Sequence, residues 1–146
     1  MHQGWLLMNN EKRWLQRLQN LEKAYSVFIR QMDEYQSDPN RESFQLALTQ
    51  AFEIIVELSW KTIKDYLENE GYDEVYNGKE AIRFAFQREL IHEAEVWMVA
   101  LKTRNLTSHL YNSEVLHETL AFIQEQFFHA LQNFLTRMKE LRDSLS

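Results

Sequence analysis

Five polar residues in one short stretch have the side chains that phosphate chemistry needs. The stretch reads Arg-Asn-Leu-Thr-Ser-His-Leu-Tyr, and its candidate residues are Arg104, Asn105, Ser108, His109 and Tyr111. The guanidinium of Arg104 is permanently charged and presents five N–H donors in a planar fork that matches phosphate oxygens. Histidine is the side chain that titrates nearest to neutral pH, so His109 is a candidate general acid or base. These residue types favour the binding or cleavage of a phosphate ester.

The spacing within this stretch limits how its residues can cooperate. On an ideal helix Asn105 and His109 are four positions apart and share a face. Arg104 and His109 are five apart, which separates them by about 140° at about 100° per residue. Joint action of Arg104 and His109 therefore requires a break in the helix, a long reach by the arginine, or a second subunit.

The same residues also have a purely structural interpretation. Asn105 and Ser108 could cap helix ends, because their side chains satisfy free backbone groups. His109 could be a hydrogen-bonded residue at the edge of the core, and Tyr111 could pack through its ring. The spacing of Arg104 and His109 alone does not choose between these alternatives.

The composition predicts a single all-α domain spanning 1–146. A chain of 146 residues is long enough to bury one core without disulfides or metals, and it contains no cysteine. Three glycines and one proline leave few places for tight turns, while 45% of the residues are hydrophobic and 26% are charged. This composition favours a few long helices, and the simplest architecture is an up-and-down four-helix bundle with a short extra helix.

The net charge and the lengths of the apolar runs limit the binding partners and the localisation of the protein. A formal net charge of −6 disfavours nonspecific binding to nucleic acid through a broad basic surface, although a small basic pocket remains compatible with it. No apolar run approaches the roughly 18 residues that a membrane span needs. The first eight residues lack the basic region and the apolar length of a signal peptide. We therefore expect a cytoplasmic protein with no membrane association.

Apolar residues recurring at three- and four-residue steps predict the first two helices. The first should begin near Asn9 or Asn10 and stop before the turn-forming stretch 37–40. The second should run from about Arg41 to Asn69, with Gly71 placed to terminate it. Its polar face carries acids ahead of bases at helical spacing, which we interpret as a solvated, ion-paired surface. The residues of this face are Glu53, Glu57, Lys61 and Lys64.

The second half of the chain predicts shorter helices around the polar stretch. The tyrosines of the loop from Gly71 to Gly78, at positions 72 and 76, could close over a pocket or pack against the core, and we favour packing. Asn77 followed by Glu80 resembles a capping box, so a third helix should begin at Lys79. A further segment should start near Glu93 and lead into Arg104. One last long helix, capped by residue 112 or 113, should continue to about position 141.

No metal or cofactor site is expected. His92-Glu93 and His117-Glu118 each begin like the zinc-binding pattern His-Glu-x-x-His, but Val96 and Ala121 occupy the position of the second histidine. A glycine-rich phosphate loop is also lacking. Any phosphate chemistry in this chain should therefore depend on arginine and histidine.

The polar stretch resembles the R-x4-H-x-Y signature of HEPN domains, the higher-eukaryote and prokaryote nucleotide-binding helical bundles. The segment 52–67, which contains Glu-Leu-Ser-Trp-Lys-Thr-Ile-Lys-Asp-Tyr-Leu, is similar to one branch of this superfamily, the nucleotidyltransferase substrate-binding proteins. Residues 81–86, residues 90–91 and Trp97 add to the resemblance, which covers roughly 46–111. Asn77-Gly78 departs from the Ser-Pro that often starts the third helix in relatives. Lys102-Thr103 replaces acidic residues that often precede the Arg-Asn pair.

The resemblance implies a homodimeric HEPN-like bundle that works with a minimal nucleotidyltransferase encoded as a separate chain. In that branch such pairs are similar to toxin–antitoxin modules, whose HEPN partner is a metal-independent ribonuclease. Arg104 would then stabilise the phosphoryl transition state, His109 would act as general acid or base, and Asn105 would orient the histidine or the phosphate. Ser108 would support the site, and the transferase would silence it by adding adenylate to Tyr111.

Two classes of function follow from this resemblance and remain open at the level of the sequence. In the first, the protein cleaves RNA. In the second, it is a non-catalytic subunit that presents a nucleotide or an acceptor to the transferase. The intact Arg104 and His109 favour the first, whereas the net acidity favours a small ligand or a protein partner. A purely structural helical dimer is a third alternative.

Overall fold

The computed structural model describes residues 2–145, which fold into helices and turns, with no strand in this range. Met1 and Ser146, the ends of the predicted domain 1–146, lie outside the described residues. The elements are α1 (His2–Ser37), α2 (Glu42–Asn69), α3 (Gly78–Gln87), α4 (Ala94–Arg104), the 3-10 turn η1 (Thr107–His109), α5 (Ser113–Phe122), the π-helical segment η2 (Ile123–Phe127) and α6 (Phe128–Asp143).

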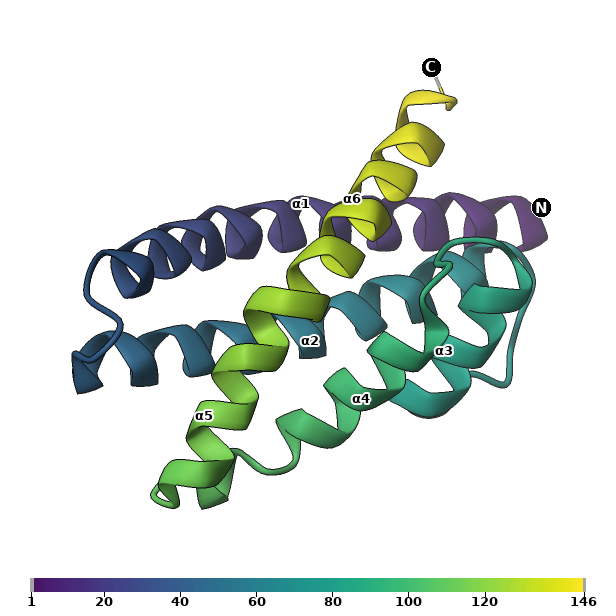
Figure 1. Cartoon of the computed structure of the whole chain (residues 1–146). Coiled ribbons are helices and arrows are strands. Elements are labelled where there is room, and N and C mark those ends of the chain that lie inside the picture. Colours follow the sequence, from purple (N-terminus) through teal and green to yellow (C-terminus); the bar gives the residue numbers. More distant parts are fainter. Residues whose placement is uncertain (1, 146) are drawn as a thin grey trace.

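The long helices α1 and α2 form an antiparallel pair, and the continuous α5–η2–α6 element crosses this pair obliquely (Figure 1). The chain returns from the far end of α2 through α3 and α4 to the corner where α5 begins. Helix α3 is the short extra helix. The all-α helical bundle predicted from composition and periodicity is thereby confirmed.

Most helix ends follow the local signals in the sequence. Gly71 adopts a φ of +100°, a left-handed conformation that glycine enters without steric cost, directly after α2. The side chain of Asn77 accepts a hydrogen bond from the backbone N–H of Glu80 at 3.0 Å and caps α3. Asn112 accepts from the N–H of Glu114 at 2.9 Å and caps α5. These signals therefore predicted each of these boundaries to within one residue or so.

The start of the first helix was predicted incorrectly. Helix α1 begins at His2, so Asn9 and Asn10 lie inside it and do not cap it. Asparagine is only modestly unfavourable in a helix interior, and the preceding residues include neither proline nor a run of β-branched side chains. Two adjacent asparagines are consequently too weak a signal to begin a helix by themselves.

The predicted last helix is interrupted by the π-helical segment η2. One extra residue per turn at this point shifts the phase of the buried stripe. Phe127, fully buried, thereby packs edge-to-face against Phe28 of α1, Phe52 of α2 and Trp97 of α4, with ring centroids 4.9–6.1 Å apart. The wide turn thus lets one ring contact three other helices at the centre of the core.

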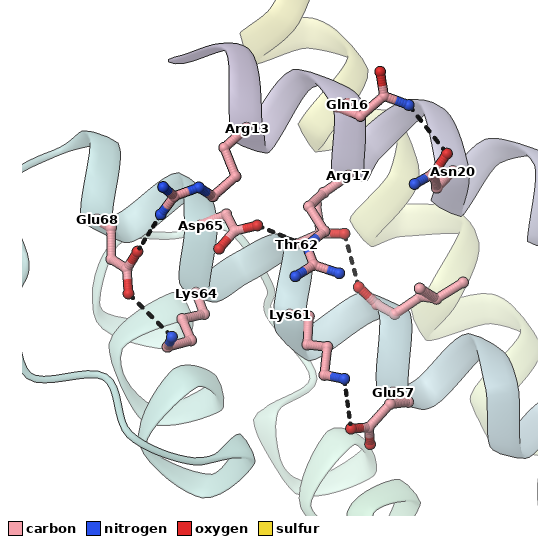
Figure 2. A network of polar contacts seen from close by, with 11 residues as sticks. Arg13, Gln16, Arg17, Asn20, Glu57, Lys61, Thr62, Lys64, Asp65 and Glu68 are labelled. Atoms are coloured by element: carbon pink, nitrogen blue, oxygen red, sulfur yellow. Dashed lines mark hydrogen bonds and ion pairs between the residues drawn. The ribbon is translucent and has the colours of Figure 1, made fainter. Parts of the chain in front are cut away.

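Ion pairs join α1 to α2 along one side of the bundle (Figure 2). Nε of Arg17 donates to the buried carboxylate of Asp65 at 2.7 Å. Arg13 lies 3.6 Å from Glu68, which Lys64 approaches to 3.2 Å from its own helix. The Arg17–Asp65 pair is the most enclosed of these contacts, and it fixes α1 against the middle of α2.

Searching the described helices for a segment both long enough and apolar enough to cross a membrane returns none.

Candidate functional site

The helix break that the spacing of Arg104 and His109 requires is present. Helix α4 ends at Arg104, Asn105 is its C-cap, and the chain then tightens into the 3-10 turn η1, which ends at His109. The polar stretch therefore lies at the corner between α4 and α5. Asn105, Ser108, His109 and Tyr111 are all exposed.

Arg104 is held by a carboxylate of α2. Its Nη2 lies 3.1 Å from Oε2 of Glu57, and the indole N–H of Trp60 donates to the same oxygen at 3.1 Å. Nζ of Lys61 lies 3.3 Å from the other carboxylate oxygen. Glu57 thus belongs to a three-donor cluster that reaches the polar stretch, and our interpretation of this face as merely solvated was incomplete.

The electrostatics of this cluster favour the ionised form of Glu57. Burial raises the pKa of its carboxyl, but the hydrogen bonds from Trp60 and Lys61 and the charges of Arg104 and Lys61 outweigh burial, and the pKa falls below its ordinary value of 4.5. The carboxylate is therefore charged at neutral pH and neutralises part of the charge of Arg104.

Arg104 keeps hydrogen-bonding capacity that Glu57 does not use. Within the described part of the chain, its buried Nε finds no acceptor. An arginine with an unsatisfied donor and a second N–H bound to a displaceable carboxylate is suited to receive a bidentate anion. This arrangement supports the phosphate-binding role predicted for Arg104.

A cavity of about 480 Å³ opens beside this ion pair, and we call it the Arg104 pocket. Two cations and two aromatic rings contribute to its walls, which come from α2, the loop before α3, the start of α3 and the end of α4. Its lining residues are Glu57, Trp60, Tyr76, Asn77, Gly78, Lys79, Leu101, Arg104 and Asn105. Its volume lies in the range usual for small-molecule sites.

The close approach of α3 shapes one wall of the Arg104 pocket. A Cβ atom built on Gly78 would lie 2.9 Å from Cδ2 of Leu101 and 3.6 Å from Cδ1 of Trp60. Glycine therefore allows the first turn of α3 to pack directly against α2 and α4.

The two loop tyrosines behave differently. Tyr72 packs against Phe84 with ring centroids 5.2 Å apart, as predicted. Tyr76 is 72% exposed and lines the Arg104 pocket, so its interpretation as a packing residue was wrong. Its backbone N–H donates to the carboxylate of Glu80 at 3.1 Å, which holds this position at the pocket mouth. The Glu80 capping pattern was the sequence signal that could have located it.

Tyr111 lines a different cavity, of about 550 Å³, between α2 and α5, which we call the Tyr111 cavity. Its other lining residues are Asn40, Glu42, Gln45, Leu46, Leu110, Ser113, Leu116 and His117. Tyr111 is 85% exposed, and its ring lies 6.2 Å from that of His109. A single chain therefore distributes the predicted site residues over two surfaces.

His109 and Ser108 lie on the turn between these two cavities. Among residues 2–145, no hydrogen bond or ion pair joins Arg104 to His109. The helix break separates their roles within one chain, with Arg104 in its pocket and His109 exposed on η1. The helix break is therefore present without a direct contact between the side chains of Arg104 and His109.

Within the described residues, no group of three or more histidine, cysteine, aspartate or glutamate side chains lies close enough to hold a metal ion.

The comparisons with known proteins agree with the nucleotidyltransferase branch of the resemblance. The family model described as "nucleotidyltransferase substrate binding protein like" matches residues 16–140. Five chains of known structure match. One, a substrate-binding domain of a nucleotidyltransferase from Haemophilus influenzae, is 25% identical with a TM-score of 0.75, covering 84% of this chain and 98% of that chain. No curated protein sequence matches. The wider HEPN assignment stays a prediction.

Proposed function

Because this chain belongs to the nucleotidyltransferase substrate binding protein like family, we propose that it is the substrate-binding subunit of a module whose nucleotidyltransferase is a separate chain. The observation that carries the proposal is the Arg104 pocket, a cavity of about 480 Å³ with cationic and aromatic walls. A concave site of this size with a few convergent polar groups is the usual form of a small-molecule site. The pocket is the place where the substrate binds.

The test of this proposal is association with a minimal nucleotidyltransferase encoded beside this protein. Co-expressed chains should elute together in gel filtration, and the complex should transfer a nucleotide that the transferase alone does not transfer. Arg104→Gln should preserve the complex and lower the transfer. Separate elution of the two chains, under conditions where each is folded, would contradict the proposal.

We propose further that the working form is a homodimer. Ile54 is 49% exposed on α2 and lines, together with Glu57 and Arg104, a third cavity of about 370 Å³. Leu58, which is partly buried, lines the same cavity, so Ile54 belongs to a contiguous apolar surface of the kind that another chain covers. A second copy packed here would also supply His109 or Tyr111 to the Arg104 of its partner.

The dimer is tested by light scattering coupled to gel filtration. Ile54→Glu should yield a monomer, because it places a charge in the apolar part of the interface. Val27→Glu is the matched control, since Val27 is 41% exposed on α1 and lies outside the three cavities described above. A monomeric wild-type protein would exclude this arrangement.

A second candidate function is metal-independent cleavage of RNA, as in a toxin–antitoxin module. It is favoured by the exposure of His109 on a turn next to Arg104, since an exposed histidine is accessible to a substrate proton. Arg104 would stabilise the phosphoryl charge, His109 would transfer the proton, and the RNA 2′-hydroxyl would attack. Asn105 and Ser108 would position the phosphate, and adenylation of Tyr111 would block entry by adding negative charge.

The ribonuclease function makes a distinct prediction. Cleavage should survive EDTA and leave 2′,3′-cyclic phosphate ends, and His109→Ala should slow it by about 10²–10⁴-fold, the usual contribution of a general acid or base. Either failure of the partner-free protein to cut RNA between pH 6 and 8, or unchanged cleavage by His109→Ala, would leave the binding subunit as the function.

A further inference from the structure

The Arg104 pocket contains an anionic side chain of the protein itself, the carboxylate of Glu57. Oε2 of Glu57 occupies the Nη2 side of Arg104 at 3.1 Å, in the position that a ligand oxygen would take. The neighbouring donor Nε of Arg104 has no acceptor among the described residues. A phosphate that engaged Nε and Nη2 together would have to take the place of Glu57.

The Arg104–Glu57 ion pair is partly shielded from water but remains accessible to a ligand. The side chains of Arg104 and Glu57 are 31% and 27% exposed. Glu57 would not lose all its partners on leaving Arg104, because Lys61 contacts its other carboxylate oxygen at 3.3 Å. Because ion pairs as exposed as this one contribute little, a stronger anion can offset the loss of the contact between Glu57 and Arg104.

The other residues that line the Arg104 pocket favour a ligand with an aromatic ring as well as a phosphate. Lys79 adds a second cation to the lining of the pocket, and Tyr76 and Trp60 add aromatic surface. Stacking on such a side chain strengthens the binding of any nucleic acid base, because every base has an aromatic face. The cavity of about 480 Å³ suits one nucleotide-sized ligand better than a long strand.

We propose that the Arg104 pocket binds a nucleotide through a terminal phosphate monoester, and that Glu57 is a built-in competitor that this phosphate displaces from Arg104. A monoester carries about −1.5 to −2 charge at neutral pH and outcompetes a carboxylate of charge −1, whereas an internal phosphodiester carries only −1. Glu57 therefore selects terminal phosphates over the backbone of RNA. This inference rests on the proposed binding function and names its substrate class.

The experiment titrates the full-length protein with AMP, adenosine, inorganic phosphate and the dinucleoside monophosphate ApA, measured by calorimetry. AMP should bind at least about tenfold more tightly than ApA or adenosine. Tyr76→Ala should weaken AMP by about tenfold and leave inorganic phosphate within about twofold. Equal affinity for AMP and ApA, or no binding of AMP at millimolar concentration, would overturn the proposal.

The role of Glu57 has its own matched variants. Glu57→Gln should strengthen AMP binding by about tenfold, because it removes the competing charge and keeps an oxygen for the indole of Trp60. Glu68→Gln is the control, since Glu68 is also an ion-paired residue of α2 and does not line the pocket. Arg104→Gln should weaken AMP by about 10- to 100-fold, as expected for lost charge-assisted hydrogen bonds. If Glu57→Gln binds AMP no more tightly than Glu68→Gln does, Glu57 does not compete with AMP for Arg104.

A direct readout is the indole N–H of Trp60, which donates to Glu57 in the free protein. Its NMR signal, assigned by its loss in Trp60→Phe, should shift on addition of AMP but not on addition of adenosine. An unmoved signal at saturation would show that Glu57 stays in place and would reject displacement. If AMP binding fails while the complex with the nucleotidyltransferase forms, this inference fails alone. If AMP binds but no complex forms, the proposed module fails and the nucleotide site stands.

Discussion

Helix α2 carries two arginine–carboxylate pairs of the same chemistry in different surroundings. Arg17 of α1 meets Asp65 at 2.7 Å, and the side chain of Asp65 is 6% exposed. Arg104 of α4 meets Glu57 at 3.1 Å, at the edge of a cavity, with side chains about a third exposed. The first pair is enclosed between two long helices, and the second lies where α4 ends. Ion pairing alone therefore does not indicate function. What distinguishes Arg104 is its Nε, which has no acceptor among the described residues, beside a cavity with aromatic walls.

The comparison predicts that the two arginines differ most in their effect on stability. Arg17→Ala should lower the free energy of unfolding by about 3 kcal/mol, because it leaves the buried carboxylate of Asp65 without its cation. Arg104→Ala should cost less than about 1 kcal/mol, since Glu57 keeps Trp60 and Lys61 and half-exposed pairs contribute little. Urea unfolding at pH 7 measures both.

Arg13→Ala serves as the control for this measurement. Arg13 makes a longer, more exposed contact of 3.6 Å to Glu68, so its loss should change the free energy of unfolding by less than about 0.5 kcal/mol. Equal destabilisation by Arg17→Ala and Arg104→Ala would remove the distinction between the two pairs.

A second prediction uses the buried tyrosine of the same scaffold. The hydroxyl of Tyr66 donates to Glu70 at 2.8 Å, and its ring packs on Trp14. Burial first, and then the hydrogen bond and negative charge of Glu70, raise the pKa of Tyr66 to about 12 from its ordinary 10. Because the folded-state pKa is the higher one, its contribution is fully present below pH 10 and is lost as the pH rises through 12.

This alkaline loss should amount to about 2–3 kcal/mol, from two pKa units at 1.36 kcal/mol each. The measurement is the difference in the free energy of unfolding between wild type and Tyr66→Phe at pH 9 and at pH 11.5. The phenylalanine variant should be less stable at pH 9 and should lose less as the pH rises. Parallel pH profiles would show that Tyr66 is not the titrating group.

The sequence predicted the scaffold far better than the site. Apolar residues at helical spacing, together with Gly71, Asn77 and Asn112, are local signals, and each acts within one or two helical turns. They correctly indicated the helical bundle and most helix ends. The π-helical segment was missed because its cause is non-local. Phe127 must reach rings on three other helices, and the periodicity of its own segment carries little trace of that requirement.

The candidate site was predicted only in part for the same reason. Arg104 and Asn105 were identified from residue type, and both line the pocket. Glu57, the ion-pair partner of Arg104, lies 47 positions earlier and looked like one member of a solvated helix face. Tyr76 looked like a packing residue because a sequence does not show which side of a loop faces a cavity. A site assembled from three helices is therefore visible in the sequence only through the residues that have unusual chemistry.

A smaller effect is predicted for the acid side of the Glu57 pair. The pKa of Glu57 is lowered from 4.5, so its stabilising contribution is present above pH 4.5 and disappears as the pH falls through the lower folded-state value. The amount should be below about 1 kcal/mol, as for other half-exposed pairs. The urea midpoint of the wild type should therefore be higher than that of Glu57→Gln at pH 6, and the two midpoints should converge near pH 3. A difference that persists unchanged at pH 3 would indicate packing and not charge as its cause.

The smallest effect on stability is expected at Tyr111, the most exposed of the large side chains at the α4–α5 corner. Tyr111→Phe removes a hydroxyl from a ring that is 85% exposed, so the free energy of unfolding should change by less than about 0.5 kcal/mol. If the transferase modifies this tyrosine, the same variant should abolish the adenylate adduct seen by intact-protein mass spectrometry with ATP. Tyr76→Phe is the control, because Tyr76 is also exposed and lines the other cavity. An adduct that survives in Tyr111→Phe and disappears in Tyr76→Phe would move the modified residue to the Arg104 pocket. A stability loss above about 1 kcal/mol would instead mean that the corner is part of the scaffold, since only a buried or paired hydroxyl contributes that much.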